Sequence, residues 1–233
     1  MNFLLQSDNV ALVEKRVVRA ATYSTSFPSA NIINAFLNNI PIDLPRDAIP
    51  VGTVEFVRQV MSKHNIVSPS MPSYPDCLFQ FLHRKVWSGQ YQDCKDNTQF
   101  VKPCETKAFT GSIIQNLEED VGPTCDCWFS EPVEFITEVR YYIVNGKLVG
   151  YGRYDDGDDN NPMPNTQTIL AAIEIMNQNN APSGYSLDFG VLTTCETALI
   201  EANDGWALGY YKGTCSYVDY ALLLAKRWAD IIQ

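Results

Sequence analysis

The chain has 233 residues, of which 45% are hydrophobic and 19% charged, a composition typical of a soluble globular protein with a sizeable core. Its formal net charge of -10 argues against a nucleic-acid backbone as the main partner, and no apolar run is long enough to span a bilayer. The start of the chain lacks the basic segment of a signal peptide. We therefore expect a cytoplasmic protein whose seven cysteines stay reduced.

The first part of the chain predicts a short strand at residues 2–5 and a second apolar segment at residues 30–37. Residues 51–61 predict a turn that leads into a helix, with Thr53 as the N-cap. The proline-rich stretch 68–75 then indicates a linker or a domain edge.

The rest of the chain separates helices and strands into runs, which favours an α+β architecture. Apolar spacing predicts helices at residues 77–87, 166–177 and 217–232, the second capped by Thr166 or Thr168. Strands are expected at residues 98–103, 128–135, 138–144 and 147–153. The last two of these strands are joined by Asn145-Gly146, a strong hairpin signal.

Two short strands, at residues 184–190 and 198–203, carry Asp188, Glu201 and Asn203. Side chains alternate across a strand, so Glu201 and Asn203 share one face. If the strands pair, Asp188 joins them and gives three oxygen ligands of the kind that Mg²⁺ prefers. Solvated acids on a polar edge strand remain an equal alternative for these residues taken alone.

Lys102 ends an apolar strand that Pro103 stops, which suits an ammonium that meets a phosphate oxygen in a groove. The polar loop that follows contains Lys107, Thr110 and Gly111 and lacks the glycine pattern of a Walker A motif. For a lone lysine, the alternative is a side chain that extends from the strand end into water.

Glu138 and Arg140 lie two positions apart on one predicted strand, and Arg153 ends the paired strand. One carboxylate and two guanidinium groups on a sheet face suit ribose hydroxyls and phosphate or carboxylate groups. Ion pairs across a solvated sheet are the alternative.

In this order, the segments 100–103, 133–140 and 199–203, together with Asp188, resemble the ATP-grasp family, in particular small members found in phages and bacteria. The resemblance covers roughly residues 65–230. It implies an α+β ATP-grasp domain at residues 65–233, with lobes at about 65–131 and 132–233. Residues 1–64 would form a small N-terminal domain that helps to make the acceptor pocket.

The resemblance also implies residue roles. ATP would be bound by Lys85 (or Arg84), Lys102, Lys107, Glu134, Phe135, Glu138 and Arg140, with Glu134 and Phe135 as the hinge that reads the adenine. Catalytic roles fall to Lys102, Arg140 and Arg153. The magnesium ligands would be Asp188, Glu201 and Asn203. The sequence departs from the family pattern after Asn203, where Asp204-Gly205-Trp206 follows, and at the short phosphate-covering loop 105–111.

The implied function is an ATP- and Mg²⁺-dependent ligase that joins a small-molecule or peptide carboxylate to an amine through an acyl phosphate. Two alternatives stay open: a phosphotransferase on the same fold, and a nucleotide-binding module without turnover, such as a phage factor that acts on a host protein. The complete Asp188, Glu201 and Asn203 set argues against the second alternative. No Ser-His or Cys-His arrangement suggests a covalent nucleophile.

Overall fold

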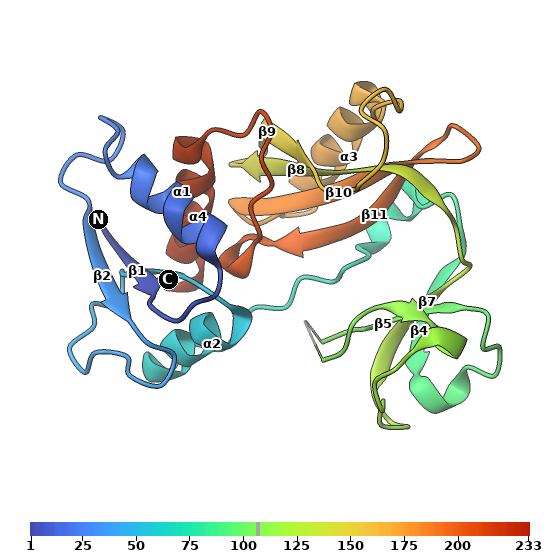
Figure 1. The fold of residues 1–233 in the computed structure, drawn as a ribbon, viewed down its shortest axis with the longest axis horizontal. Helices are drawn as coiled ribbons and strands as arrows, with labels where there is room; N and C mark the ends of the chain where they lie inside the picture. The colour runs from blue at the N-terminus through green and yellow to red at the C-terminus, as the bar shows by residue number, and fades with distance from the viewer. Residues whose placement is uncertain (106–107) are drawn as a thin grey trace.

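The computed structural model describes residues 1–105 and 108–233, and Figure 1 shows them as three sheets with helices packed around two of them. No helix within these two ranges is long and apolar enough to cross a membrane. Lys107, predicted to bind the nucleotide, lies outside the described residues.

The N-terminal sheet is parallel with strand order β2-β1-β3. Its strands are β1 (Asn2–Gln6), β2 (Asn31–Ala35) and β3 (Ile49–Val51). Helix α1 (Leu12–Ala21) connects β1 to β2, and α2 (Val54–Lys63) follows β3. The strand predicted at the N-terminus and the helix capped by Thr53 are confirmed, whereas the sequence reading did not include α1.

Thr53 caps α2, because its side-chain oxygen accepts a hydrogen bond from the backbone N–H of Phe56 at 3.3 Å. We expect Thr53→Ala to lower the free energy of unfolding by about 1 kcal/mol, since that N–H loses its partner. Urea denaturation measures the change. Thr53→Ser keeps the oxygen and should match the unmodified protein, and equal losses for both variants would contradict the capping role.

The second sheet is antiparallel with strand order β4-β7-β5-β6. Its strands are β4 (Val86–Gln90), β5 (Phe100–Pro103), β6 (Ser112–Ile113) and β7 (Asp126–Ser130). The helix predicted at residues 77–87 is wrong: a 3-10 helix, η1 (Asp76–Phe81), is followed by β4. His83 takes a positive φ of 49° that ends the helical segment, and pairing with β7 then fixes the extended chain.

The third sheet is antiparallel with strand order β11-β10-β8-β9. Its strands are β8 (Phe135–Val144), β9 (Lys147–Arg153), β10 (Gly184–Leu192) and β11 (Thr197–Asp204). The strand predicted at residues 128–135 is instead divided between β7 and β8, around Pro132, which has no N–H to donate. Helix α3 (Thr166–Gln178) is capped by Asn165 rather than by Thr166 or Thr168.

The two faces of the third sheet have different environments. Val139, Tyr141 and Ile143 of β8 pack with Leu187 and Phe189 of β10 in the core beneath α3. The alternate residues, including Arg140 and Asp188, therefore point to the opposite face. This alternation places the charged side chains of the two strands on one surface.

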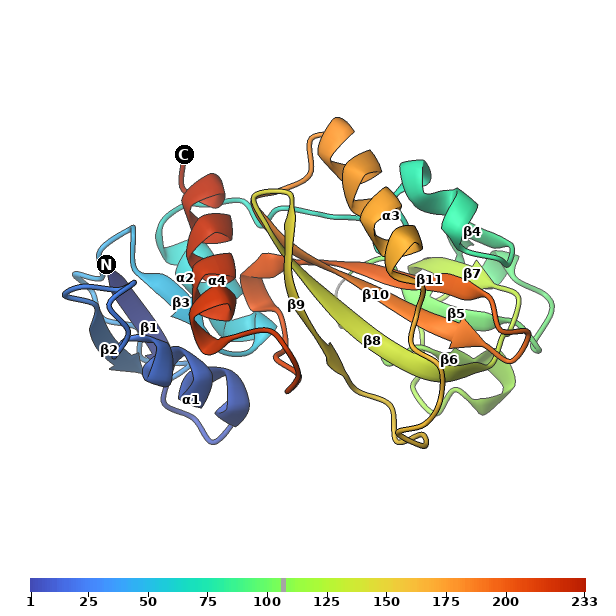
Figure 2. The same ribbon diagram turned by 90° about the horizontal axis from the view of Figure 1, so that it is seen from above.

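Helix α4 (Tyr217–Ile231) connects this sheet to the N-terminal part of the chain (Figure 2). Its buried residues share one hydrophobic core with β1, α1 and α2, and Trp228 donates a hydrogen bond to the carbonyl of Arg46 at 3.1 Å. The N-terminal sheet thus completes its core with the C-terminal helix. The predicted division at residue 64 remains a prediction.

Candidate functional site

Five polar residues share the face of the third sheet that α3 does not cover. They are Glu138 and Arg140 on β8, Asp188 on β10, and Glu201 and Asn203 on β11. Asp188 lies opposite Arg140 on one side and opposite Glu201 on the other. Strand register therefore brings together residues that are up to 65 positions apart in the chain, as 203 minus 138.

Arg140 and Asp188 form a two-pronged ion pair. Nε and Nη2 of Arg140 donate to Oδ1 and Oδ2 of Asp188 at 2.9 and 2.7 Å, and the Asp188 side chain is only 1% exposed. Burial raises the pKa of the Asp188 carboxyl, while Arg140 acts in the opposite direction. Burial works against the charge of Arg140 as well, but Asp188 more than offsets it and the pKa of the guanidinium is raised.

Lys102 reaches Glu201 across the gap between two sheets. It comes from β5 in the second sheet, and its ammonium donates to Glu201 on β11 of the third sheet. Burial opposes both charges, but each partner outweighs that effect in the other: the pKa of Lys102 is raised and the pKa of Glu201 is lowered. The ring of Tyr74 lies 5.3 Å from the Lys102 nitrogen and supports the cation.

The amide of Asn203 lies against both carboxylates, because it donates to Asp188 at 3.3 Å and hydrogen bonds to Glu201. Two carboxylates and an amide oxygen on adjacent strands are an all-oxygen donor set that fits Mg²⁺, a cation that protein sites usually hold with few protein ligands. Within the described ranges, no group of three His, Cys, Asp or Glu side chains forms an all-protein metal site. The predicted ligands are thus close together, and their role remains a prediction.

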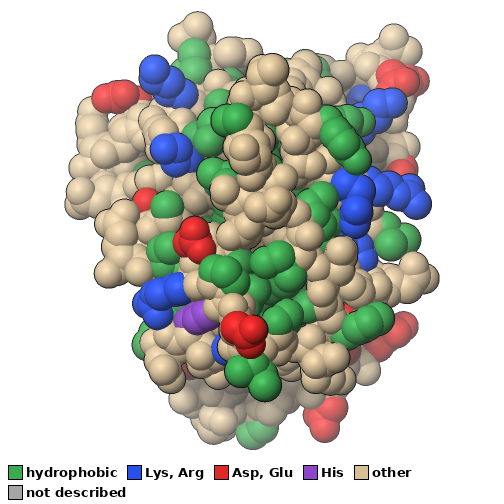
Figure 3. Space-filling view, turned by 90° about the vertical axis from the view of Figure 1, so that its left-hand side faces the viewer, with side chains coloured by type: hydrophobic (Ala, Val, Ile, Leu, Met, Phe, Trp, Pro, Cys, Tyr) green, Lys and Arg blue, Asp and Glu red, His purple; other side chains and the backbone are tan. Residues whose placement is uncertain are grey.

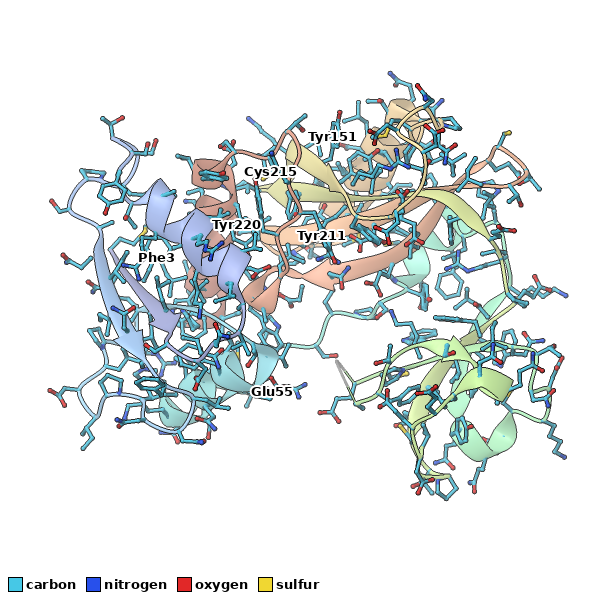
Figure 4. The ribbon with its side chains drawn as sticks, in the orientation of Figure 1. Phe3, Glu55, Tyr151, Tyr211, Cys215 and Tyr220 are labelled. Carbon is cyan, nitrogen blue, oxygen red and sulfur yellow. The ribbon has the colours of Figure 1, made fainter. Side chains whose placement is uncertain are left out.

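Glu138 lies beside two tyrosines that border this face. Burial raises the pKa of its carboxyl, and a hydrogen bond from Tyr154 acts in the opposite direction. Tyr154 stacks on Tyr211 with a ring distance of 4.8 Å, and Tyr211 lies 5.0 Å from the Arg140 guanidinium carbon. Figure 4 shows Tyr211 over the third sheet, with Tyr220 on the side of α1 and α4.

The hinge predicted at Glu134 and Phe135 lies where the chain passes from the second sheet to the third. Glu134 is exposed, and Phe135 begins β8. Arg84 lies close by, 5.7 Å from the Tyr74 ring and 5.8 Å from the Phe135 ring. Its guanidinium donates to the carbonyls of Leu82, Leu199 and Ile200.

These bonds fix the strand immediately before Glu201. Lys85, the other basic residue considered for this segment, has a side chain that is 83% exposed and lies 3.8 Å from Glu131. Neither side chain of this basic pair contacts the charged face directly in the bonds that the structure shows.

Arg153 ends β9, opposite Val139 of β8. Its guanidinium donates to both oxygens of Asp155 at 2.7 and 2.6 Å. Asp155 also accepts the backbone N–H groups of Glu138 and Gly157 at 2.8 Å each, so this pair fixes the end of the hairpin next to Glu138.

The Arg153 side chain holds the pKa of Asp155 below its ordinary value of 3.8. A lowered folded-state pKa stabilises the fold above the unfolded value, and this contribution is lost as the pH falls through the folded value. We expect Asp155→Asn to lower the free energy of unfolding at pH 7 by about 1 kcal/mol. The difference from the unmodified protein should shrink below pH 3.8. Urea titrations across pH test this, with exposed Asp156→Asn as the control, and a constant difference would contradict it.

The structure adds residues to the site that the sequence patterns did not indicate. Tyr74, Tyr154 and Tyr211 surround the charged face, and Arg84 fixes the approach of β11. No local pattern marks these residues, because each contributes through contacts that are distant in sequence. The sequence departure after Asn203 did indicate the segment that contains Tyr211.

A family model described as an ATP-grasp domain, the second family of its clade, matches residues 81–221. A comparison by sequence with curated proteins gives no match.

Among solved structures, D-alanyl-alanine synthetase A from Vibrio cholerae O1 biovar eltor str. N16961 is similar with a TM-score of 0.57 and 12% identity, over 99% of this chain and 98% of the other. The RimK domain protein ATP-grasp from Sphaerobacter thermophilus DSM 20745 gives 0.56 and 12%, over 97% and 99%. The D-cycloserine synthetase DcsG gives 0.52 and 10%, over 100% and 99%. At these identities the likenesses show a shared fold.

Proposed function

Because the chain belongs to this family of ATP-grasp domains, we propose that it is an ATP- and Mg²⁺-dependent ligase that joins a carboxylate to an amine. The observation that carries this proposal is the meeting of Lys102 from the second sheet with Glu201 and the Arg140–Asp188 pair from the third. Two of the structures that share the fold bear the names of synthetases.

The charges of this face suit a nucleotide triphosphate and its metal. Lys102 and Arg140 are cations held close to the position where phosphate oxygens would lie, and Asp188, Glu201 and Asn203 would hold Mg²⁺. When bound, the metal would neutralise phosphate charge. Glu138 would accept hydrogen bonds from ribose hydroxyls, and the segment at Glu134 and Phe135 would contact the adenine.

The proposed reaction has two steps. A substrate carboxylate oxygen attacks the γ-phosphorus of ATP, the bond to the β-phosphate oxygen breaks, and an acyl phosphate and ADP form. An amine then attacks the acyl carbon, inorganic phosphate leaves, and the amine loses a proton. Lys102, Arg140 and Arg153 contribute by orienting the reactants and balancing negative charge, so no protein nucleophile is needed.

The first test is calorimetry of ATP binding with and without Mg²⁺. We expect Mg²⁺-dependent binding, followed by ADP and phosphate release when amino acids and short peptides are offered as carboxylate and amine. Hydroxylamine in place of the amine should give a hydroxamate, the product expected from an acyl phosphate. A stable phosphorylated product would indicate a phosphotransferase, and absence of ATP binding would overturn the proposal.

A further inference from the structure

A groove of about 290 Å³ lies on the N-terminal part of the molecule, away from the charged face of the third sheet. Its lining includes Leu12, Lys15, Arg16 and Arg19 of α1, together with Ser7 after β1 and Asn34 of β2. We call this the α1 groove. Figure 3 shows the end of the molecule that carries the N-terminal sheet, with Lys and Arg side chains gathered toward one edge.

The α1 groove concentrates positive charge on a protein whose net charge is -10. Arg16 and Arg19 are exposed, and neither forms an ion pair with an acid of the described ranges. Arg19 donates only a long hydrogen bond of 3.4 Å to the neutral amide oxygen of Asn34. These two guanidinium groups therefore remain available for an external anion.

Lys15 behaves differently from the two arginines. Its ammonium donates to the backbone carbonyl of Asp8 at 2.6 Å, and the Asp8 and Glu14 carboxylates partly balance its charge. The Asp8 carboxylate is itself engaged by the N–H of Leu37 at 2.8 Å and by the amide of Gln6 at 3.0 Å. Lys15 thus forms a fixed side of the groove, and the external charge comes from Arg16 and Arg19.

The position of the α1 groove is typical of a binding site in an α/β sheet. Ser7 follows the carboxyl end of β1, and Asn34 lies near the carboxyl end of the neighbouring parallel strand β2. Ligands of open α/β sheets bind outside this edge. The lining residues of α1 extend over two helical turns, so the groove is longer than one small anion requires.

This length favours an extended peptide over a single anion. Positions 15 and 19 are separated by about 6 Å along a helix axis. Alternate side chains of an extended chain are separated by about 6.6 Å, so two carboxylates two positions apart match this spacing. Leu12 adds an apolar surface at one end.

The opposite flank of α1 contacts the segment that covers the candidate site. Glu14 accepts the backbone N–H of Tyr210 at 2.9 Å, and the neighbouring carbonyl of Gly209 accepts a hydrogen bond from Arg140 at 3.4 Å. A peptide held in the α1 groove is therefore attached to the helix that borders the charged face on its other side.

We propose that the α1 groove binds an acidic segment of a polypeptide substrate, with Arg16 and Arg19 as the principal contacts. The substrate role rests on the proposed ligase function, whereas the binding step does not require ATP. The two can therefore fail separately: loss of ATP binding would remove the ligase, and loss of peptide binding would remove only this inference.

The test is fluorescence anisotropy of a labelled oligoglutamate peptide, without ATP and at low salt. We expect binding to the unmodified protein and at least about tenfold weaker binding to the double variant Arg16→Glu/Arg19→Glu. The matched control is Lys63→Glu/Lys226→Glu, which changes the net charge equally at two exposed positions outside the groove and should bind as the unmodified protein does. Calorimetry with Mg²⁺-ATP should give the same affinity for all three proteins.

Neutral glycine-serine peptide, inorganic phosphate and a single-stranded oligonucleotide serve as competitors. Weak competition by all three supports an acidic peptide as the ligand. The proposal is overturned if oligoglutamate does not bind, if both double variants weaken binding equally, or if phosphate or the oligonucleotide competes better than unlabelled oligoglutamate.

Discussion

Replacement of Glu201 by glutamine is expected to remove the Mg²⁺ dependence of ATP binding and to reduce ADP release by about a hundredfold or more. The amide has almost the same shape and can still accept the hydrogen bond from Lys102, so the protein should remain folded. The variant nevertheless loses one of the two carboxylates of the proposed metal set. Calorimetry with and without Mg²⁺, followed by an ADP release assay, measures both effects.

The control for this experiment is Glu174→Gln, which removes an exposed carboxylate on α3, on the other side of the third sheet. This variant should bind ATP and release ADP as the unmodified protein does. If Glu201→Gln keeps the Mg²⁺ dependence, Glu201 is not a metal ligand and the proposed set fails. If the control loses activity to the same extent, the loss reflects charge or stability rather than the site.

Replacement of Arg140 by methionine is expected to lower the free energy of unfolding by about 3–5 kcal/mol at pH 7, because it leaves the buried Asp188 carboxylate without its cation. Asp188 is 1% exposed and receives two hydrogen bonds from Arg140, so water cannot replace the lost partner without structural change. Urea denaturation measures the loss, and exposed Lys226→Met provides a control expected to change stability by less than about 0.5 kcal/mol.

A double variant separates the stranded charge from lost packing. Arg140→Met/Asp188→Asn removes both charges, and we expect it to be more stable than the sum of the two single losses predicts by about 2 kcal/mol. Strict additivity of the two substitutions would show that the pair does not act as a unit. If Arg140→Met unfolds completely, the double variant and Asp188→Asn still report whether removal of both charges restores the fold.

The two ion pairs have consequences for the nucleotide site as a whole. Lys102–Glu201 connects the second sheet with the third, while Arg140–Asp188 connects neighbouring strands of the third sheet. Each carboxylate proposed to hold Mg²⁺ is therefore paired with a cation proposed to hold phosphate. ATP and Mg²⁺ would offer both sets new partners of opposite charge, so binding need not leave a buried charge uncompensated.

The identity of the family and the set of acidic and basic residues were accessible from the sequence because both depend on short local patterns. Alternation on the strands that carry Glu138, Arg140, Glu201 and Asn203 put these side chains on common faces, as the structure confirms. Asn145-Gly146 likewise predicted the hairpin, since both residues adopt the positive φ that its turn requires.

Where contacts between distant segments compete with local preference, the sequence prediction failed. The apolar spacing at residues 77–87 is helical, yet β4 forms because β7 offers a full set of backbone partners. Asn165, not a threonine, caps α3, because its side chain accepts the N–H groups of Gln167 and Thr168. Local propensities differ by a fraction of a kcal/mol per residue, so tertiary pairing decides such cases.

The sequence by itself determined the family, the strand faces and the chemistry of Lys102, Arg140, Asp188, Glu201 and Asn203. Only the tertiary structure decided which of these charges pair, that Arg84 fixes the strand before Glu201, and that α1 forms a basic groove on the N-terminal sheet. The reason is physical: alternation and residue type are properties of neighbouring positions. Ion pairs and grooves, in contrast, depend on strand register and packing between segments that the chain brings together only when it folds.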